Sequence, residues 1–573
     1  MTTMTAVLPF FLIDLLPHNT VLLASAAQTV IASIDTGKVL YTVSHEQPIL
    51  APRISAIVPL STSQGSSSSH GESIVDCLLA LLGDDKELHV YKVSGLSTHN
   101  VNLEKTWSSP LPKRGVKMVW EEDSNELEKR LIVGDRHGDV RSFSISIKNT
   151  ESDEREAKRR RMTTIEAKAQ DDEEEDFDSS HPPHLGHVSM LTDFVLTSFT
   201  SSSTQSPPMY IITCDRDEHI RISRWGKRRA GHLALRYLLG SREAVGGLCV
   251  IDNELIGVLQ QKVKTEAAKE IVKCPLLVST ESSRLRIWSL HKDDEASSRQ
   301  DCQMVIDLKD IVSPYLKVDS QRERMRERSF GKGKVDSKKN PKMLEESLEA
   351  VDSEKTNGAI IMTNLSAMHI DGEVYVSFIV DGASALFTVP LSRLLSSATE
   401  SAASHIQVLD MILPIVDQAY QTEGDEKKIW MTCDVRPDVA KSNSNRRGLR
   451  MIRWNRVQQC WEEEDGKANQ LIENQSQLES MSTPEVANSL LLYDAMTLYI
   501  KQEFERTVLV EQSVAPNGLV RGGLANFERS TKVKGDLGPA NKGNSERETG
   551  KKVKAREEML KRIEQALGGS GEQ

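Results

Sequence analysis

The stretch YIITCDRDEHIRISRW, residues 210–225, decides the fold of this chain. It begins with an apolar run at residues 210–213 that is typical of a buried β-strand. A short charged turn follows at residues 215–218, and residues 219–223 alternate between two faces as a second strand would. The stretch therefore predicts an antiparallel β-hairpin whose turn carries more charge than closing the chain requires.

The same pattern recurs along the chain. Six further segments, beginning near residues 21, 77, 130, 275, 374 and 428, show an apolar strand, a short polar turn and a second strand. A small antiparallel sheet cannot bury its own two faces, but a closed ring of such sheets can. Seven copies therefore predict an all-β fold, a seven-bladed β-propeller over residues 1–462. The apolar run AVLPFFLIDLL at residues 6–16 is expected to be its first strand.

The propeller region is longer than seven blades need. Repeats of about 40–45 residues account for roughly 300 residues. The excess predicts long disordered inserts at about residues 61–73, 149–184 and 291–357, where the sequence is polar or highly charged. Residues 463–573 are expected to form a low-complexity, partly helical tail.

Composition narrows the function classes. The formal net charge of −11 argues against a chain that binds nucleic acid over its whole surface. The seven cysteines have no CxxC spacing, which favours reduced thiols over a disulfide framework or a zinc site. No dinucleotide-binding fingerprint, P-loop or nucleophile elbow is present in the sequence. We therefore expect no catalytic, cofactor-binding or metal-binding residues in this chain.

Charged residues of the hairpin turn are the first candidates for contact with another molecule. Arg216 lies in the turn, and Arg136 occupies the matching position of the third copy. Glu218 and Arg221 complete a mixed-charge set that is expected on the neighbouring third and fourth blades. Such a set fits a docking surface for a rigid protein partner. Solvated charges without a partner are the alternative.

Other residues near the turn are predicted to hold the blade together. His187 and His232 stand in Gly-His pairs, which in propeller blades tie loops together through hydrogen bonds. Asp217 is predicted to be the internal structural aspartate of the turn. Ser223 stands where an aromatic side chain usually ends the strand, so Trp225 is expected to fill the core in its place.

Two basic segments lie in the predicted inserts. One is predicted to be a nuclear import signal, with an RNA-binding patch or a solvated charge run as alternatives: Lys158, Arg159, Arg160 and Arg161. The acidic run at residues 171–176 would weaken attraction to phosphate, which favours import and a nuclear location, with the cytoplasm as a second compartment. Residues 322–342 are predicted to be a flexible linker, with non-specific contact to RNA phosphates as the alternative.

Several motifs together resemble one known family. They are GHVSMLTD at residues 186–193, YIITCDRDEHIRIS at residues 210–223, the pair Gly231-His232, and GDRHGDV at residues 134–140. In this combination they resemble the WD-repeat, non-catalytic subunit of the eukaryotic tRNA (guanine-N7)-methyltransferase. The match is specific over roughly residues 131–290 and looser elsewhere.

The resemblance implies a WD40-type propeller in a heterodimer with a catalytic subunit. That partner would bind S-adenosylmethionine and form 7-methylguanosine in the tRNA variable loop, and this chain would meet tRNA mainly through the complex. The resemblance also implies that Arg136, Glu218 and Arg221 face the catalytic subunit. Arg136 stands where the family more often has Lys, which keeps the charge but changes the donor geometry. A general WD-repeat adaptor for chromatin or ubiquitin-ligase assembly is the alternative function.

Overall fold

The chain divides into two compact units, Met1–Phe504 and Glu505–Gln573. The computed structural model describes residues of the first unit only, namely 6–60, 75–121, 128–147, 182–198, 209–226, 230–241, 243–290, 302–318, 360–396, 403–423, 426–440, 447–464, 470–482, 484–490 and 492–493. Within these ranges, no helix combines the length and the apolar character that crossing a membrane would require.

Seven four-stranded antiparallel sheets form the body of this unit, and each is a meander in which consecutive strands pair. Blade 1 contains β2 (Phe10–Leu16), β3 (Thr20–Ser25), β4 (Gln28–Ser33) and β5 (Val39–Ser44). Blade 2 contains β6 (Pro52–Pro59), β7 (Val75–Gly83), β8 (Glu87–Ser94) and β9 (Asn102–Pro110). Blade 3 contains β10 (Gly115–Trp120), β11 (Glu128–Asp135), β12 (Asp139–Ser146) and β13 (Leu185–Gly186).

The remaining blades follow the same order. Blade 4 contains β14 (Leu191–Ser198), β15 (Met209–Asp215), β16 (Ile220–Trp225) and β17 (Ala234–Leu238). Blade 5 contains β18 (Val245–Ile251), β19 (Leu276–Glu281), β20 (Arg284–Ser289) and β21 (Cys302–Asp307). Blade 6 contains β22 (Met362–Ile370), β23 (Glu373–Val380), β24 (Ala385–Pro390) and β25 (Gln407–Asp410). Blade 7 contains β26 (Ile415–Glu423), β27 (Glu426–Cys433), β28 (Leu449–Asn455) and β29 (Cys460–Glu463).

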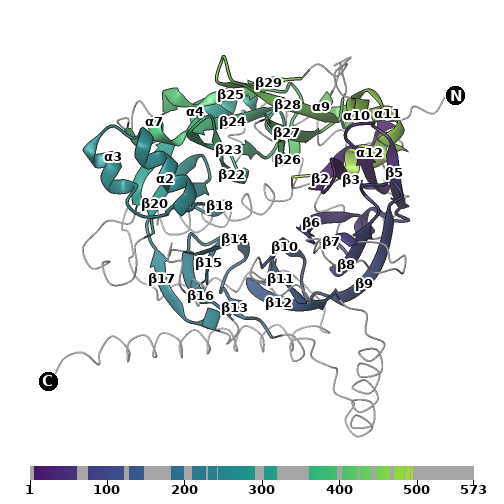
Figure 1. Ribbon diagram of the computed structural model, residues 1–573, viewed down its shortest axis with the longest axis horizontal. Helices are drawn as coiled ribbons and strands as arrows, with labels where there is room; N and C mark the ends of the chain where they lie inside the picture. Colours follow the sequence, from purple (N-terminus) through teal and green to yellow (C-terminus); the bar gives the residue numbers. More distant parts are fainter. Residues whose placement is uncertain are drawn as a thin grey trace, which may run out of the picture. The chain divides into compact units, whose positions relative to one another are not determined.

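The sheets are arranged as a ring, with the first strand of each blade innermost (Figure 1). The second strands are almost wholly buried, as in β3 and β19, because a neighbouring blade covers each face. Continuous apolar runs in the sequence reflect this two-sided burial. The predicted seven-bladed propeller is confirmed, and Trp225 lies in the core, where its indole Nε1 donates to Glu121 Oε1 at 2.9 Å.

The ring closes between blade 7 and blade 1. Asp417 Oδ2 accepts a hydrogen bond from the backbone N–H of Ile13 at 2.9 Å, which joins the two innermost strands. In a separate two-stranded sheet, β1 (Ala6–Val7) pairs with β30 (Met481–Ser482), which joins the strand before blade 1 to the segment after blade 7. The run at residues 6–16 thus forms two strands, β1 and β2, rather than the single strand expected. Pro9 has no backbone N–H to donate, and it stands at the break between them.

Short helical segments connect or flank the strands of the ring at several places. The α-helices are α2 (Asn253–Lys262), α3 (Glu266–Ile271), α4 (Lys309–Val312), α7 (Leu391–Ser396), α9 (Pro437–Ala440), α10 (Gln470–Glu473), α11 (Gln475–Leu478) and α12 (Pro484–Ser489). Short 3₁₀ turns are η1 (Pro48–Leu50), η3 (Ala230–His232), η5 (Ser313–Tyr315) and η7 (Ala403–His405). Helix α2 begins after Asp252, whose side chain accepts the N–H of Leu255.

One predicted insert differs from the structure. The insert expected at about residues 291–357 contains β21, the outer strand of blade 5, and the helix α4. The last propeller strand, β29, ends at Glu463, and the compact unit continues through Phe504. Leu471, Leu478 and Tyr493 are buried against the ring although their segment is mostly polar. Helical structure was expected in this segment, but widely spaced apolar residues in polar surroundings give no periodic signal, so the burial of these three side chains was not predicted.

Several sequence predictions concern residues outside the described ranges. These are the inserts, which fall largely in residues 61–74 and 148–181, the import signal at residues 158–161, and the basic stretch at residues 322–342. The tail beyond residue 493 also lies outside them.

Candidate partner-docking surface on blades 3 and 4

The charged turn between β15 and β16 is organised by Asp215. Its Oδ1 accepts hydrogen bonds from the backbone N–H groups of Asp217 at 2.9 Å and His219 at 3.0 Å. Glu218 adopts a left-handed conformation with φ of 76°, which closes the turn tightly. Asp217 itself is exposed. The prediction that Asp217 is the internal aspartate is therefore wrong, because Asp215, two residues earlier, holds the turn.

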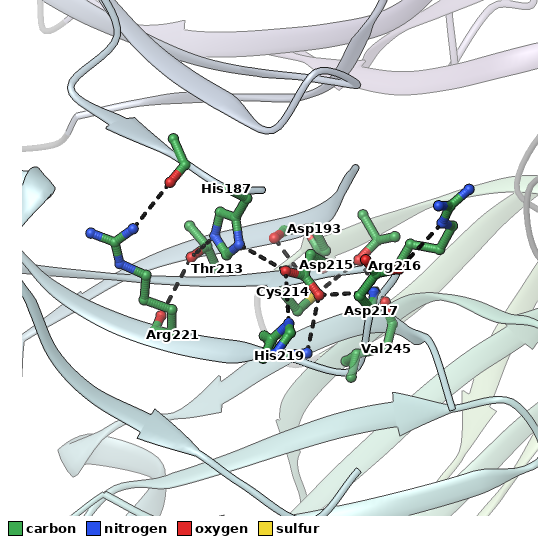
Figure 2. Close-up of polar contacts among 12 residues, drawn as sticks. His187, Asp193, Thr213, Cys214, Asp215, Arg216, Asp217, His219, Arg221 and Val245 are labelled. Carbon is green, nitrogen blue, oxygen red and sulfur yellow. Dashed lines mark hydrogen bonds and ion pairs between the residues drawn. The ribbon is translucent and has the colours of Figure 1, made fainter. Parts of the chain in front are cut away.

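A buried histidine connects this turn to the loop before β14. The ring of His187 is 3% exposed, with Nδ1 at 3.0 Å from Asp215 Oδ2 and Nε2 at 2.6 Å from Thr213 Oγ1 (Figure 2). Burial would raise the pKa of Asp215, but hydrogen bonds from His187 and from the backbone of His219 outweigh it and lower the pKa. The predicted loop-tying role of His187 is confirmed.

Arg221 lies in the interior of blade 4. Its Nη1 donates to the carbonyl of Gly186 at 3.1 Å, and its Nη2 donates to the carbonyls of Gly231 at 2.9 Å and His232 at 2.7 Å. Its Nε donates to Ser223 Oγ at 3.0 Å. The residue is only 7% exposed, and this burial lowers the pKa of its guanidinium. These contacts give Arg221 a structural role, and they do not fit the prediction that it faces a partner.

The same contacts explain the two Gly-His pairs. Gly186 and Gly231 offer their carbonyls to one guanidinium, so Arg221 clamps the two loops together. His232 contributes through its backbone carbonyl while the residue is exposed, so the predicted role of its side chain is not seen.

Blades 3 and 5 carry a related buried arginine. In blade 3, Arg141 Nη1 donates to Asp135 Oδ2 at 2.7 Å, and in blade 5 Arg286 Nε donates to Glu281 Oε2. Each acid ends the second strand of its blade and each arginine lies in the third. In blade 4 the acid is taken by His187, so Arg221 binds carbonyls instead. An acid followed five or six residues later by Arg recurs in blades 3, 4 and 5, and this spacing is the sequence signal that could have indicated a structural role.

The turn of blade 3 joins directly to this network. Gly138, with φ of 99°, accepts a hydrogen bond on its carbonyl from the N–H of His187 at 2.9 Å. Arg136 donates its backbone N–H to the carbonyl of Arg114 at 2.9 Å, and Arg216 donates likewise to Met190 at 2.9 Å. Arg136 and Arg216 therefore occupy equivalent turns, and the loop before β14 lies between the two turns.

We define the blade 3–4 surface as Arg136, Val188, Arg216 and Glu218. Val188 is 94% exposed in the loop that joins the two turns, and the three charged residues are half-buried. In Figure 2, Arg216 lies at the opposite end of the Asp215 network from Arg221. The structure thus brings three of the four predicted residues to neighbouring turns and places the fourth, Arg221, inside.

Exposed apolar side chains gather around this blade. Among the described residues, ten large apolar side chains are exposed, and four of them lie on blade 4 or its flanking loops: Val188, Leu233, Tyr237 and Leu239. Sequence reasoning did not select these four, since a single exposed Leu or Val in a loop gives no pattern. Apolar and charged groups side by side are typical of protein interfaces.

Four of the seven cysteines are buried, and three are half-buried. No group of three or more His, Cys, Asp or Glu side chains there is placed to hold a metal ion. The seven cysteines, all within the described ranges, form no disulfide, and burial raises the pKa of Cys77, Cys249 and Cys433 to about 12. Such thiols stay protonated at neutral pH, as expected for small buried residues.

Part of this chain matches the model of a known protein family. Residues 149–257 match the model of the tRNA methyltransferase TRM82 WD40 domain. This segment contains Arg216, Glu218 and Arg221, whereas Arg136 lies outside it. Its described part covers β13 of blade 3, all of blade 4, β18 and the start of α2.

Curated relatives carry a consistent name. The tRNA (guanine-N(7)-)-methyltransferase non-catalytic subunit TRM82 of Coccidioides immitis is 34% identical over 200 residues, which cover 30% of this chain and 36% of that protein. The subunit of the same name from Aspergillus fumigatus is 28% identical over 272 residues, covering 40% of this chain and 51% of that protein. The Vanderwaltozyma polyspora protein is 30% identical over 173 residues, covering 30% of each chain.

This chain therefore spans about a third to a half of the length of the relatives it matches. Among solved structures, Saccharomyces cerevisiae Sqt1 matches with 8% identity and a TM-score of 0.39, over 80% of this chain and 85% of that chain. A match this loose says nothing about function. The resemblance predicted from the sequence is confirmed by the family model and the curated relatives: over residues 149–257 this chain is similar to the TRM82 WD40 domain of tRNA (guanine-N7)-methyltransferase non-catalytic subunits.

Proposed function

We propose that this chain is the non-catalytic scaffold subunit of a tRNA (guanine-N7)-methyltransferase heterodimer. Its catalytic partner would bind S-adenosylmethionine and transfer the methyl group to N7 of a guanine in the tRNA variable loop. The observation that carries the proposal is the match of residues 149–257, which include the charged turn, to the TRM82 WD40 domain model, together with the similarity of this chain to curated non-catalytic subunits. We propose that the complex acts in the nucleus, with the cytoplasm as a second compartment.

The blade 3–4 surface is proposed to contact the catalytic subunit. Arg136, Arg216 and Glu218 supply charges of both signs, which set orientation and exclude wrong partners. Val188 supplies apolar area next to them, and Tyr237 and Leu239 lie on the same blade. Apolar area with a charged margin matches the usual anatomy of a protein interface.

The network beneath the surface gives it rigidity. Asp215 fixes the turn through two backbone N–H groups, and His187 joins that turn to the next loop. A surface held in this way loses little conformational entropy when a partner binds. A rigid surface also stabilises one conformation of a mobile partner, because it binds that conformation better than the others. This is how a chain without catalytic groups would activate a methyltransferase.

Reconstitution tests the function directly. The purified chain, the catalytic subunit, S-adenosylmethionine and tRNA are combined, and 7-methylguanosine is measured with each protein alone and with both. We expect methylation to rise strongly only when both proteins are present. An unchanged rate on adding this chain, with no complex in pull-down, would remove the proposal and favour the general adaptor.

Charge reversal tests the surface separately. Arg216→Glu should weaken the complex by about tenfold or more, since an interfacial charge of the wrong sign costs several kcal/mol. The matched control is Arg453→Glu, which makes the same change at an exposed position of β28 on blade 7. Equal affinities for both variants, measured by calorimetry, would show that the surface is wrongly assigned even if the function is right.

A further inference from the structure

The innermost strands enclose a cavity of about 570 Å³ at the centre of the ring. Residues from the first strand of every blade line it, among them Asp14, Arg53, Lys117, Asp193 and Asp417. Its volume falls in the range of small-molecule sites, which combine apolar walls with a few convergent polar groups. Arg136 lines both this cavity and the blade 3–4 surface, and the other lining residues have no part in the function proposed above.

Positive charge is concentrated on one wall of the cavity. Arg53, Arg114 and Arg136, from blades 2 and 3, line it beside a single carboxylate, Asp84. Asp84 Oδ2 lies 3.4 Å from Arg53 Nε, and its Oδ1 lies 3.0 Å from Arg114 Nε. Asp84 therefore lies against two guanidinium groups, and Arg136 lines the same wall.

One N–H group of the Arg53 guanidinium donates to none of the described residues. Its Nη2 is buried and has no hydrogen-bond partner among them. Its guanidinium carbon lies 3.8 Å from the ring centroid of Phe11, so packing holds the group in place. Burial lowers the pKa of Arg53, and the nearby charge of Arg114 lowers it further while Asp84 opposes both. A buried donor without an acceptor is costly, and an anion would relieve that cost.

Acids elsewhere in the cavity are already engaged. Lys117 Nζ lies 2.7 Å from Asp193 Oδ1, and Asp193 Oδ2 accepts the N–H of Leu248 at 2.8 Å. Asp14 Oδ2 accepts from Ser55 at 2.7 Å, and Asp417 Oδ2 accepts from Ile13. These carboxylates join one blade to the next through their own partners.

We propose that this wall is a binding site for a multivalent oxyanion carried by a small molecule. Arginine presents its N–H groups in a planar fork that matches the oxygens of phosphate and carboxylate groups. The ligand would place its anionic group between Arg53 and Arg114, near Arg136, and would rest its remaining atoms on the apolar walls of the cavity. Binding would add a common ligand to blades 2 and 3 and so brace the ring.

Calorimetry on the full chain tests the site. Pyrophosphate and citrate are titrated separately at constant ionic strength, and we expect saturable binding of at least one. Arg114→Gln should weaken that binding about tenfold or more, because a charge-assisted hydrogen bond is lost. Asp84→Asn should strengthen it several-fold, since the competing carboxylate is gone. Arg453→Gln removes an exposed charge far along the chain and should change nothing.

Each outcome of these titrations either supports the proposed site or overturns it. Binding of pyrophosphate alone identifies a phosphate ligand, and binding of citrate alone identifies a carboxylate ligand; both support the site. Absence of saturable heat from both anions would overturn it, as would equal weakening in Arg114→Gln and Arg453→Gln. If Asp84→Asn does not fold, Arg114→Gln still decides. The catalytic subunit is absent from this experiment, so its result is independent of the proposed methyltransferase role.

Discussion

Replacing Arg221 by Ala should destabilise blade 4 rather than remove a contact with a partner. The guanidinium donates to three backbone carbonyls and to one hydroxyl at distances between 2.7 and 3.1 Å. The Ala variant leaves those carbonyls without their donor inside a buried site.

The size of the effect follows from these contacts. Each hydrogen bond from a charged donor contributes about 1.5–3 kcal/mol. The three hydrogen bonds to carbonyls share one guanidinium, so their contributions are not additive. Removing one partner from a buried charged network typically lowers the free energy of unfolding by about 3–5 kcal/mol. We expect the free energy of unfolding of Arg221→Ala to fall by about 4 kcal/mol.

Urea unfolding followed by tryptophan fluorescence measures this change. Arg224→Ala is the matched control, because Arg224 lies three residues later in the same strand and is exposed. That variant should change the free energy by less than about 0.5 kcal/mol. Full stability of Arg221→Ala together with a weakened complex would refute the structural role and restore the predicted contact with the catalytic subunit.

Three further variants probe other parts of the ring. Gly138→Ala should lose about 2–3 kcal/mol in urea unfolding, because φ is 99° and a Cβ would stand 2.5 Å from a neighbouring carbonyl oxygen; Gly226→Ala, in open space, should lose far less. Burial raises the pKa of Asp417 from 3.8 to about 7, so the folded chain holds a proton that the unfolded chain releases. Stability should therefore fall as pH rises from about 4 to about 7, and Asp417→Asn should flatten this profile of urea midpoints. Tyr493→Phe removes a hydrogen bond of 3.2 Å to Asp434 and should lower stability by about 1 kcal/mol in the same assay.

The second and third strands of every blade were predictable from sequence. Strands such as β3 and β19 are buried on both faces, so their residues form continuous apolar runs that stand out from the polar turns.

The outer strands were not predictable in the same way. In β21, CQMVID, most residues are half-buried, and the strand follows a long polar segment. A half-exposed edge strand has neither a clear alternation nor a clear apolar run.

The position of the candidate surface was predictable, but the division of roles within it was not. The charge of the turn marked the region, and Arg136 and Arg216 do lie at equivalent turns of neighbouring blades. Arg221 was expected on the surface from its place beside the charged turn and from the family resemblance, whereas its partners are backbone carbonyls as far as 35 residues away. Backbone acceptors carry no sequence signature, so the spacing of an acid and an arginine that blades 3, 4 and 5 share was the one hint of a structural role.

The two roles follow from one geometric fact about a strand that enters from a charged turn. Side chains in the turn project away from the sheet, while those in the first residues of the strand must face its covered surfaces. Arg216 belongs to the first group and Arg221 to the second, although only five residues separate them. Under the proposed function, folding and docking therefore depend on different residues of one hairpin. Variants of Arg216 should change affinity at constant stability, and variants of Arg221 should change stability first and affinity only through it.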